Sequence, residues 1–133
     1  MKNIKFLIIP IILSLVACGK YDEGPSLSLR SKENRITNNW TEVERVINGT
    51  DTTIRDFCYE FGKDGVFEDY FPGPMSYALK LGTWELTDEK TNLTLNWSSR
   101  IDVYKIKRLT NKEFWLEQTT DSSFVELKWE RCN

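Results

Sequence analysis

Short segments in which apolar and polar residues alternate run through the chain from Trp40 onward. In the last of them, Val125, Leu127 and Trp129 alternate with charged residues. Successive residues of a strand point to opposite faces of a sheet, so this pattern is typical of antiparallel strands with one apolar and one solvated face. We expect eight such strands, at residues 40–47, 54–61, 66–70, 75–87, 92–97, 102–109, 113–118 and 123–131.

The segments are joined by short turn sequences such as Asn48-Gly49 and Asp64-Gly65, whose residues reach positive φ at little energetic cost. Short connections favour an up-and-down barrel, whereas a Greek-key sandwich needs long crossovers. We therefore expect one all-β domain, a small antiparallel up-and-down barrel of about eight strands, with the sandwich as the alternative. The apolar parity slips at Gly82, which indicates a β-bulge.

The N-terminal residues have a different character. Lys2 and Lys5 precede an apolar run, residues 6–16. This run is shorter than the roughly 20 residues of a membrane span and is typical of a signal peptide. Leu15-Val16-Ala17-Cys18 resembles the bacterial lipobox. The resemblance implies cleavage before Cys18 and its modification by fatty acyl chains such as palmitate; the alternative is an ordinary secretory signal.

These features divide the chain into three parts: a lipoprotein signal peptide (1–17), a lipidated Cys18 with its tether (18–35) and the barrel (36–133). A multiply acylated cysteine would anchor the protein to a membrane. No Asp follows Cys18 directly, and the charged residues Lys20, Asp22 and Glu23 resemble the export signal of Bacteroidetes surface lipoproteins. We expect a lipid-anchored outer-membrane protein, with display at the cell surface as one alternative.

Composition narrows the classes of function. The 133 residues include 18 Lys and Arg, 20 Asp and Glu, and no His, for a net charge of −2. This balance argues against a nucleic-acid partner. Without His the chain has no Ser-His-Asp triad and no imidazole metal ligand. The neighbouring carboxylates Glu68 and Asp69 point to opposite faces of a strand. We expect no enzyme activity, no cofactor and no metal.

Asn38-Asn39-Trp40 has a counterpart in lipocalins, whose first strand opens with Gly-x-Trp. Asn38 stands in place of the Gly, and Asn is the next-best residue for a left-handed turn. The chain resembles the small lipocalin-like lipoproteins of Bacteroidetes in this motif and in residues 27–31, 61–65, 82–84 and 104–110. The resemblance implies that Trp40 plugs one end of the barrel and that Arg131 covers it, in a cation–π stack worth about 0.5–2 kcal/mol.

The interior of the barrel bears on function. Small eight-stranded barrels are filled by side chains or hold one small ligand. Eight inward aromatic positions are candidates to line a ligand site: Trp40, Phe57, Tyr59, Phe61, Tyr77, Trp84, Trp97 and Trp129. By resemblance, we expect a small apolar or amphipathic ligand. The alternative is a solid core in a structural or interaction protein, which contacts another envelope component or a host macromolecule through its outer face.

Two cysteines remain once Cys18 is lipidated. Cys58 and Cys132 form an even pair in an oxidising compartment. Both lie on the polar parity of their strands, so a disulfide between them would run outside the barrel wall. Two free thiols are the alternative, because the strand at 40–47 is expected to lie between the strands that carry them.

Overall fold

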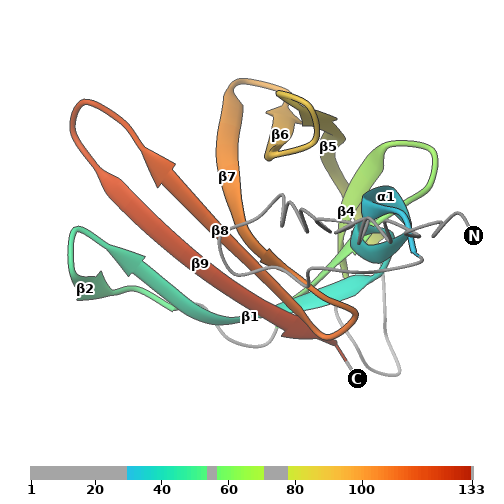
Figure 1. Cartoon of the computed structure of the whole chain (residues 1–133), viewed down its shortest axis with the longest axis horizontal. Coiled ribbons are helices and arrows are strands. Elements are labelled where there is room, and N and C mark those ends of the chain that lie inside the picture. Colours follow the sequence, from blue (N-terminus) through green and yellow to red (C-terminus); the bar gives the residue numbers. More distant parts are fainter. Residues whose placement is uncertain (1–29, 54–56, 71–77, 133) are drawn as a thin grey trace, which may run out of the picture.

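The computed structural model describes residues 30–53, 57–70 and 78–132. The predicted signal peptide, the acylation site Cys18 and the candidate Tyr77 lie outside the described residues. None of the helices within these ranges has the length and apolar character that a membrane span requires. The described elements are α1 (Lys32–Ile36), β1 (Asn39–Ile47), β2 (Thr50–Asp51), β3 (Cys58–Phe61), β4 (Val66–Tyr70), β5 (Ala78–Thr87), β6 (Asn92–Trp97), β7 (Ile101–Leu109), β8 (Glu113–Thr119) and β9 (Phe124–Arg131) (Figure 1).

The strands form a closed antiparallel barrel. The pairing order is β1-β3-β4-β5-β6-β7-β8-β9, and β9 pairs back with β1. The predicted all-β barrel of eight strands is therefore confirmed, and the β1–β9 ladder excludes the open sandwich. The two-residue β2 pairs with the end of β1 as an addition to the barrel. This strand consists of two exposed polar residues, so no alternation of apolar and polar positions marks it in the sequence.

Helix α1 covers one end of the barrel, which we call the closed end. The Ser31 hydroxyl caps this helix by accepting a hydrogen bond from Asn34 N at 3.1 Å. Buried Arg35 donates to the carbonyl oxygen of Leu109 at 3.1 Å, and the indole Nε1 of Trp40 donates to that of Ile36 at 2.9 Å. The predicted tether at 18–35 thus overlaps α1, whose residues Arg35 and Ile36 are hydrogen-bonded to residues of the barrel.

Asn38 does not form the expected left-handed turn. Among the described non-glycine residues, positive φ occurs at Asn48, Asp88, Glu89 and Lys90. Asn38 instead donates from its side-chain Nδ2 to the carbonyl oxygen of Arg35 at 3.0 Å. The conformational argument for Asn38 was therefore wrong. Its side chain satisfies a backbone acceptor at the end of α1.

The β-bulge expected at Gly82 is confirmed. Phe67 pairs with Gly82 and Glu68 pairs with Lys80, so Leu81 is the extra residue of β5. A Cβ atom at position 82 would overlap the carbonyl oxygen of Asn96 on β6 and lie 3.2 Å from the Phe67 ring. Glycine is required here because another strand approaches the backbone closely.

Aromatic side chains fill the barrel interior towards the closed end. The Phe61 ring lies 5.7 Å from Phe67, 5.9 Å from Trp84 and 5.8 Å from Trp129, measured between ring centroids. Buried Trp84 donates from Nε1 to the carbonyl oxygen of Gly62 at 3.0 Å. In this part of the barrel the solid-core alternative describes the packing correctly.

Cys58 and Cys132 are joined as a disulfide, with their Cα atoms 5.9 Å apart. This distance lies within the range that disulfides span. Strand β1 does lie between the two cysteines: Thr41 pairs with Cys58, and Cys132 N donates to the carbonyl oxygen of Asn39 at 2.9 Å. The intervening strand does not keep the two cysteines apart at this end of the barrel.

Candidate ligand-binding site

The barrel wall parts at the end opposite α1, which we call the open end. Strand β1 pairs with β3 only over residues 39–41, and β7 pairs with β6 over 101–105 but with β8 only from Lys105 onward. Figure 1 shows the result: β8, β9, β1 and β2 extend together away from α1, while β5, β6 and β7 diverge from them. Side chains inside the barrel are therefore less tightly enclosed at this end.

A cavity of about 60 Å³ lies inside the barrel where the two groups of strands part. It is lined by Arg45, Tyr59, Phe61, Phe67, Leu95, Trp97, Arg100, Tyr104, Leu127 and Trp129. Four of the eight aromatic candidates lie on it, namely Tyr59, Phe61, Trp97 and Trp129. Trp40 and Trp84 are buried in the core near the closed end, and half-buried Phe57 precedes β3 without lining the cavity.

Arg45 is the lining residue that the sequence pattern concealed. Position 45 has the opposite parity to Trp40, so a regular strand would place its side chain outside the barrel. The β1–β9 register shifts between Glu42 and Glu44, however, and leaves Val43 as an extra residue. The shift reverses the parity and turns Arg45 inward. The signal that could have been used is Glu42, a charged residue on the parity of Trp40.

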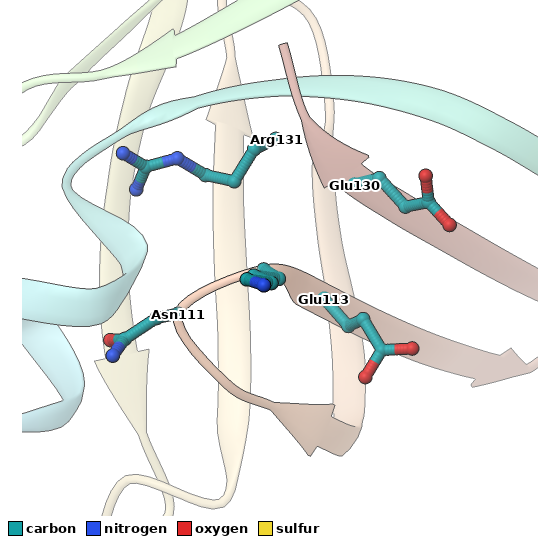
Figure 2. A pocket seen from close by; sticks show the side chains of 5 residues that line it. Asn111, Glu113, Glu130 and Arg131 are labelled. Carbon is teal, nitrogen blue, oxygen red and sulfur yellow. The ribbon is translucent and has the colours of Figure 1, made fainter. Parts of the chain in front are cut away.

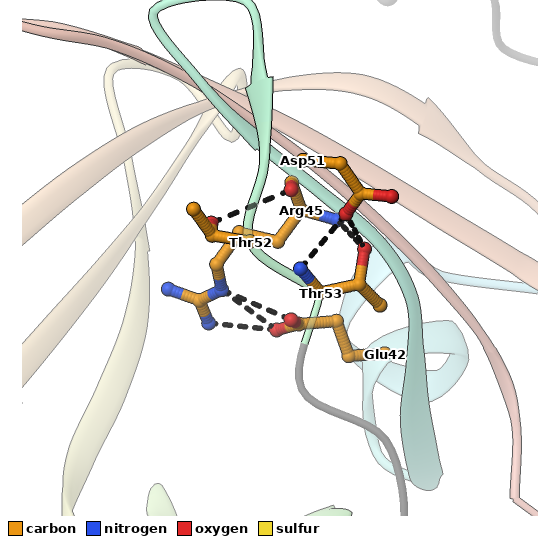
Figure 3. Close-up of polar contacts among 5 residues, drawn as sticks. All are labelled: Glu42, Arg45, Asp51, Thr52 and Thr53. Carbon is orange, nitrogen blue, oxygen red and sulfur yellow. Dashed lines mark hydrogen bonds and ion pairs between the residues drawn. The ribbon is translucent and has the colours of Figure 1, made fainter.

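Glu42 and Arg45 form an ion pair on the inner face of β1 (Figure 3). Arg45 Nη2 lies 2.7 Å from Glu42 Oε2, and Nε donates to both carboxylate oxygens at 3.0 and 3.1 Å. The Glu42 side chain is only 1% exposed. Its hydrogen bonds raise the pKa of Arg45 above the ordinary value, so the guanidinium stays charged. A fixed charge pair therefore lies at the edge of an aromatic cavity.

Residues 50–53 hold the backbone of Arg45 in place (Figure 3). Arg45 N donates to the hydroxyl of Thr53 at 3.0 Å, and Thr52 N donates to the Arg45 carbonyl oxygen at 2.7 Å. The Thr53 hydroxyl in turn donates to Asp51 Oδ1. This segment takes over the pairing that β1 loses when β3 ends, so Arg45 is positioned by its backbone as well as by Glu42.

A second polar group forms the rim of the cavity at the turn between β6 and β7. Trp97 Nε1 donates to Asp102 Oδ2 at 2.7 Å, and Arg100 Nε donates to the same oxygen at 2.9 Å. The Arg100 guanidinium also lies 4.6 Å from the centre of the Trp97 ring. These contacts fix the orientation of Trp97 at the cavity edge.

Two tyrosines line the cavity in neutral form. Burial raises the pKa of Tyr104 to about 12, with a further contribution from the nearby Asp102 carboxylate. Burial likewise raises the pKa of Tyr59, helped by the Glu42 carboxylate. Both hydroxyls therefore keep their protons at neutral pH and are able to donate hydrogen bonds.

A larger surface pocket of about 620 Å³ lies at the closed end, beside the turn between β7 and β8 and the end of β9. It is lined by Asn111, Lys112, Glu113, Glu130 and Arg131 (Figure 2). Figure 2 shows Glu130 and Arg131 pointing to opposite sides of β9. The lining is polar and carries both signs of charge, and it contains no apolar side chain. We therefore regard the internal cavity as the better candidate site.

The structure places the predicted barrel-closing pair, Trp40 and Arg131, opposite each other on neighbouring strands. Arg131 is directly opposite Trp40 in the β1–β9 ladder, but its side chain is exposed on the surface pocket. The residues that cover Trp40 include Ile36, whose carbonyl oxygen accepts its indole hydrogen bond. The cation–π stack of Arg131 on Trp40 stays a prediction.

No group of three or more Cys, Asp or Glu side chains in the described part of the chain is arranged to hold a metal ion. The inner carboxylates have partners of opposite charge or of donor character instead. Glu42 is bonded to Arg45, and Asp102 is bonded to Trp97 and Arg100. The chemistry of the site is thus that of hydrogen bonding and aromatic contact.

Two solved structures have a fold similar to that of this chain. A lipocalin-like protein from Bacteroides uniformis matches with a TM-score of 0.56 at 12% identity, over 74% of this chain and 99% of that one. An uncharacterized protein from Bacteroides eggerthii matches with a TM-score of 0.55 at 13% identity, over 72% of this chain and 98% of that one. No protein-family model and no curated protein matches the chain. The chain has a lipocalin-like fold, and the resemblance stated from its sequence is confirmed at that level.

Proposed function

We propose that this chain is a lipid-anchored envelope protein whose lipocalin-like barrel binds the head group of a small amphipathic molecule at its open end. The observation that carries the proposal is the internal cavity lined by Tyr59, Trp97, Tyr104 and Trp129. Aromatic walls with a few polar groups are typical of small-molecule sites. Of the two alternatives left open by the sequence, this arrangement favours ligand binding.

The size of the cavity limits what enters it. A volume of about 60 Å³ holds roughly four water-sized atoms, whereas sites that enclose a whole ligand measure about 300–1,000 Å³. Only the head of a ligand fits inside. Leu79, paired with Asp69 near the open end, is 56% exposed and offers apolar contact to the part of the ligand that stays outside the cavity.

The attachment of the chain to the barrel supports an orientation for the proposed anchor. Arg30, the first described residue, donates to Asn111 Oδ1 at 3.3 Å at the closed end. A tether from a lipidated Cys18 would therefore reach the barrel from that side. In the proposed protein the open end is directed away from the membrane that holds the lipid.

The test of binding is native mass spectrometry of residues 19–133, secreted without the anchor and purified gently. We expect a reproducible additional mass that leaves on activation. Trp97→Ala should lose this mass, whereas Arg131→Ala, at the closed-end surface, should retain it. An unliganded mass that persists after incubation with an envelope lipid extract would refute the binding proposal.

The test of anchoring uses the full chain expressed in a diderm bacterium. We expect the protein in the outer-membrane fraction, with a mass that corresponds to cleavage before Cys18 and acylation of that residue. Cys18→Ala should yield unacylated protein that no longer fractionates with membranes. Recovery of the wild-type chain as unacylated protein would contradict this part of the proposal.

A second candidate function is supported by the outer face of β7. Ile101 is 63% exposed and Val103 is 44% exposed, and both side chains lie on the same face of that strand. Exposed apolar pairs of this kind occur in protein interfaces. An interaction protein would lose its partner on substitution of Ile101→Lys with Val103→Lys, whereas a ligand-binding protein would keep its bound mass.

A further inference from the structure

One indole inside the barrel differs from the others in its hydrogen bonding. Trp40 Nε1 donates to the Ile36 carbonyl oxygen at 2.9 Å, and Trp84 Nε1 donates to that of Gly62 at 3.0 Å. Trp97 Nε1 donates to Asp102. Trp129 is 4% exposed and lines the cavity, yet its buried Nε1 has no hydrogen-bond partner among the residues that the structure describes. Buried indole N–H groups normally find an acceptor, so this donor indicates what the cavity takes.

The surroundings of Trp129 are largely aromatic. Its ring centre lies 5.4 Å from Tyr59, 5.8 Å from Phe61 and 5.5 Å from Phe114, so aromatic rings enclose it. In the β1–β9 ladder Trp129 is paired with Glu42. Both carboxylate oxygens of Glu42 accept hydrogen bonds from Arg45. Trp129 also lines the cavity, which is therefore where an acceptor could reach its Nε1.

Other groups on the cavity wall are also donors. Arg45 directs Nε and Nη2 at Glu42, whereas Nη1 makes no hydrogen bond among the described contacts. The Tyr59 and Tyr104 hydroxyls are protonated because burial raises the pKa of each phenol. The inner carboxylates Glu42 and Asp102 are already bonded. Apart from the two hydroxyls, which also accept, the polar side chains that line the cavity are hydrogen-bond donors.

We infer that the cavity receives a carbonyl-type oxygen, from a carboxylate or a carboxamide, on Trp129 Nε1. This inference rests on the proposed function and adds to it the chemical class of the head group. The apolar part of the ligand then extends past Trp97 to the open end. A carboxylate and a carboxamide both present a carbonyl-type acceptor oxygen but differ in charge, so the test uses one probe of each kind.

One feature favours a different head group. Asp69 Oδ1 is the other buried polar atom without a partner among the described residues. Asp69 is not among the residues that line the cavity, and burial raises the pKa of its carboxyl group, which favours the neutral form. These two properties count against recognition of an amine by Asp69, which the test includes as the competing outcome.

The experiment compares three probes with the same six-carbon chain: hexanoate, hexanamide and hexylamine. The readout is the indole region of a ¹H–¹⁵N correlation spectrum of residues 19–133, in which Trp129→Phe identifies the Trp129 signal. We expect hexanoate or hexanamide to move that signal downfield in a saturable manner, while the Trp84 signal stays in place. An equal shift with hexylamine, or no shift with any probe, would overturn the inference.

A variant arm measures the contribution of the donor. Trp129→Phe keeps an aromatic ring and removes the N–H, so we expect affinity for the bound probe to fall about tenfold. Trp84→Phe removes a buried indole donor away from the cavity and should leave affinity unchanged. Wild-type affinity in Trp129→Phe would refute the inference. If that variant does not fold, the remaining indole signals are assigned through their partners and the wild-type titration decides.

The outcomes also separate this inference from the proposed function. Hexylamine binding that leaves the Trp129 signal in place would preserve a ligand site and exclude the carbonyl head group. A co-purified mass without any carbonyl or carboxylate would have the same meaning. Both the inference and the proposed function would be refuted only if no bound mass were found on the native protein, either as purified or after incubation with the lipid extract.

Discussion

Glu42 shows how a single charged residue is tolerated inside the barrel. Its carboxylate is nearly inaccessible to solvent and accepts three hydrogen bonds from the Arg45 guanidinium. Removing one partner of a buried ion pair leaves an uncompensated charge, whereas removing both leaves an apolar contact.

We predict that Arg45→Met destabilises the protein by about 3–5 kcal/mol. The double variant Glu42→Met with Arg45→Met should lose much less. Urea denaturation of the three proteins measures both effects. Equal losses in the single and the double variant would show that Arg45 acts through packing of its aliphatic stem rather than through charge.

Asp69 is predicted to make stability depend on pH. Burial raises its pKa in the folded protein above the value of 3.8 in the unfolded chain. Between the two values the folded state holds the proton more tightly, so stability falls as pH rises across this window and stays lower above it. Asp69→Asn should therefore stabilise the protein at pH 7 and give no gain below pH 3.8.

The measurement is thermal unfolding of wild type and Asp69→Asn across this pH range. A gain of equal size at every pH would contradict the electrostatic explanation. It would indicate that the amide makes a hydrogen bond that the carboxylate lacks. The same unpartnered Asp69 Oδ1 atom thus links stability to the ligand test above.

At the scale of the element, the bulge in β5 depends on one glycine. Gly82→Ala would place a Cβ atom on the Asn96 carbonyl oxygen of β6, which is backbone and has little freedom to move. We predict a loss of roughly 2–4 kcal/mol, comparable to severe overpacking. Gly49→Ala is the control, because nothing lies within 4 Å of its Cβ position and only the positive φ of 80° penalises it.

Gly49→Ala should lose only about 1 kcal/mol. Equilibrium denaturation compares the two variants, and indole signals of Trp84 and Trp97 report on the β5–β6 pair. Similar losses in both would mean that β5 and β6 separate easily at the bulge. The distinction matters because Gly82 is paired with Trp97, which lines the cavity.

For the molecule as a whole, the disulfide closes the chain from β3 to the end of β9, over a separation of 74 positions. A cross-link over a long loop restricts the unfolded ensemble. We predict that Cys58→Ser with Cys132→Ser loses about 2–5 kcal/mol of stability. In the protein purified from an oxidising compartment, neither cysteine should react with an alkylating agent before reduction. Alkylation of both without reduction would contradict the bond.

The barrel contains two regions with different packing. Near α1 the aromatic residues pack as a solid core, as the interaction-protein alternative requires. At the open end the strands part and leave a small, largely aromatic cavity with a few polar groups. The interior thus combines a filled core and a small cavity, and the choice between ligand binding and a partner role stays a proposal.

The sequence alone determined the strands, the turns and the bulge at Gly82, because each depends on local information, and the short turns between the strands favoured the barrel. Period-two alternation, turn residues and a break in parity are visible within about ten residues. The predicted bounds of β4 and β6 coincide with those observed. Two local features escaped it: the bulge at Val43, where no glycine marks the site, and the two-residue β2.

Only the tertiary structure decided which inward residues form core and which form a cavity. That outcome depends on how far β7 and β8 diverge and on the sum of side-chain volumes from all the strands, which no single segment contains. The tertiary structure likewise brought Cys58 to Cys132 and turned Arg45 inward beside Glu42. It also left Trp129 Nε1 without an acceptor, since a missing partner is a property of everything that surrounds the donor.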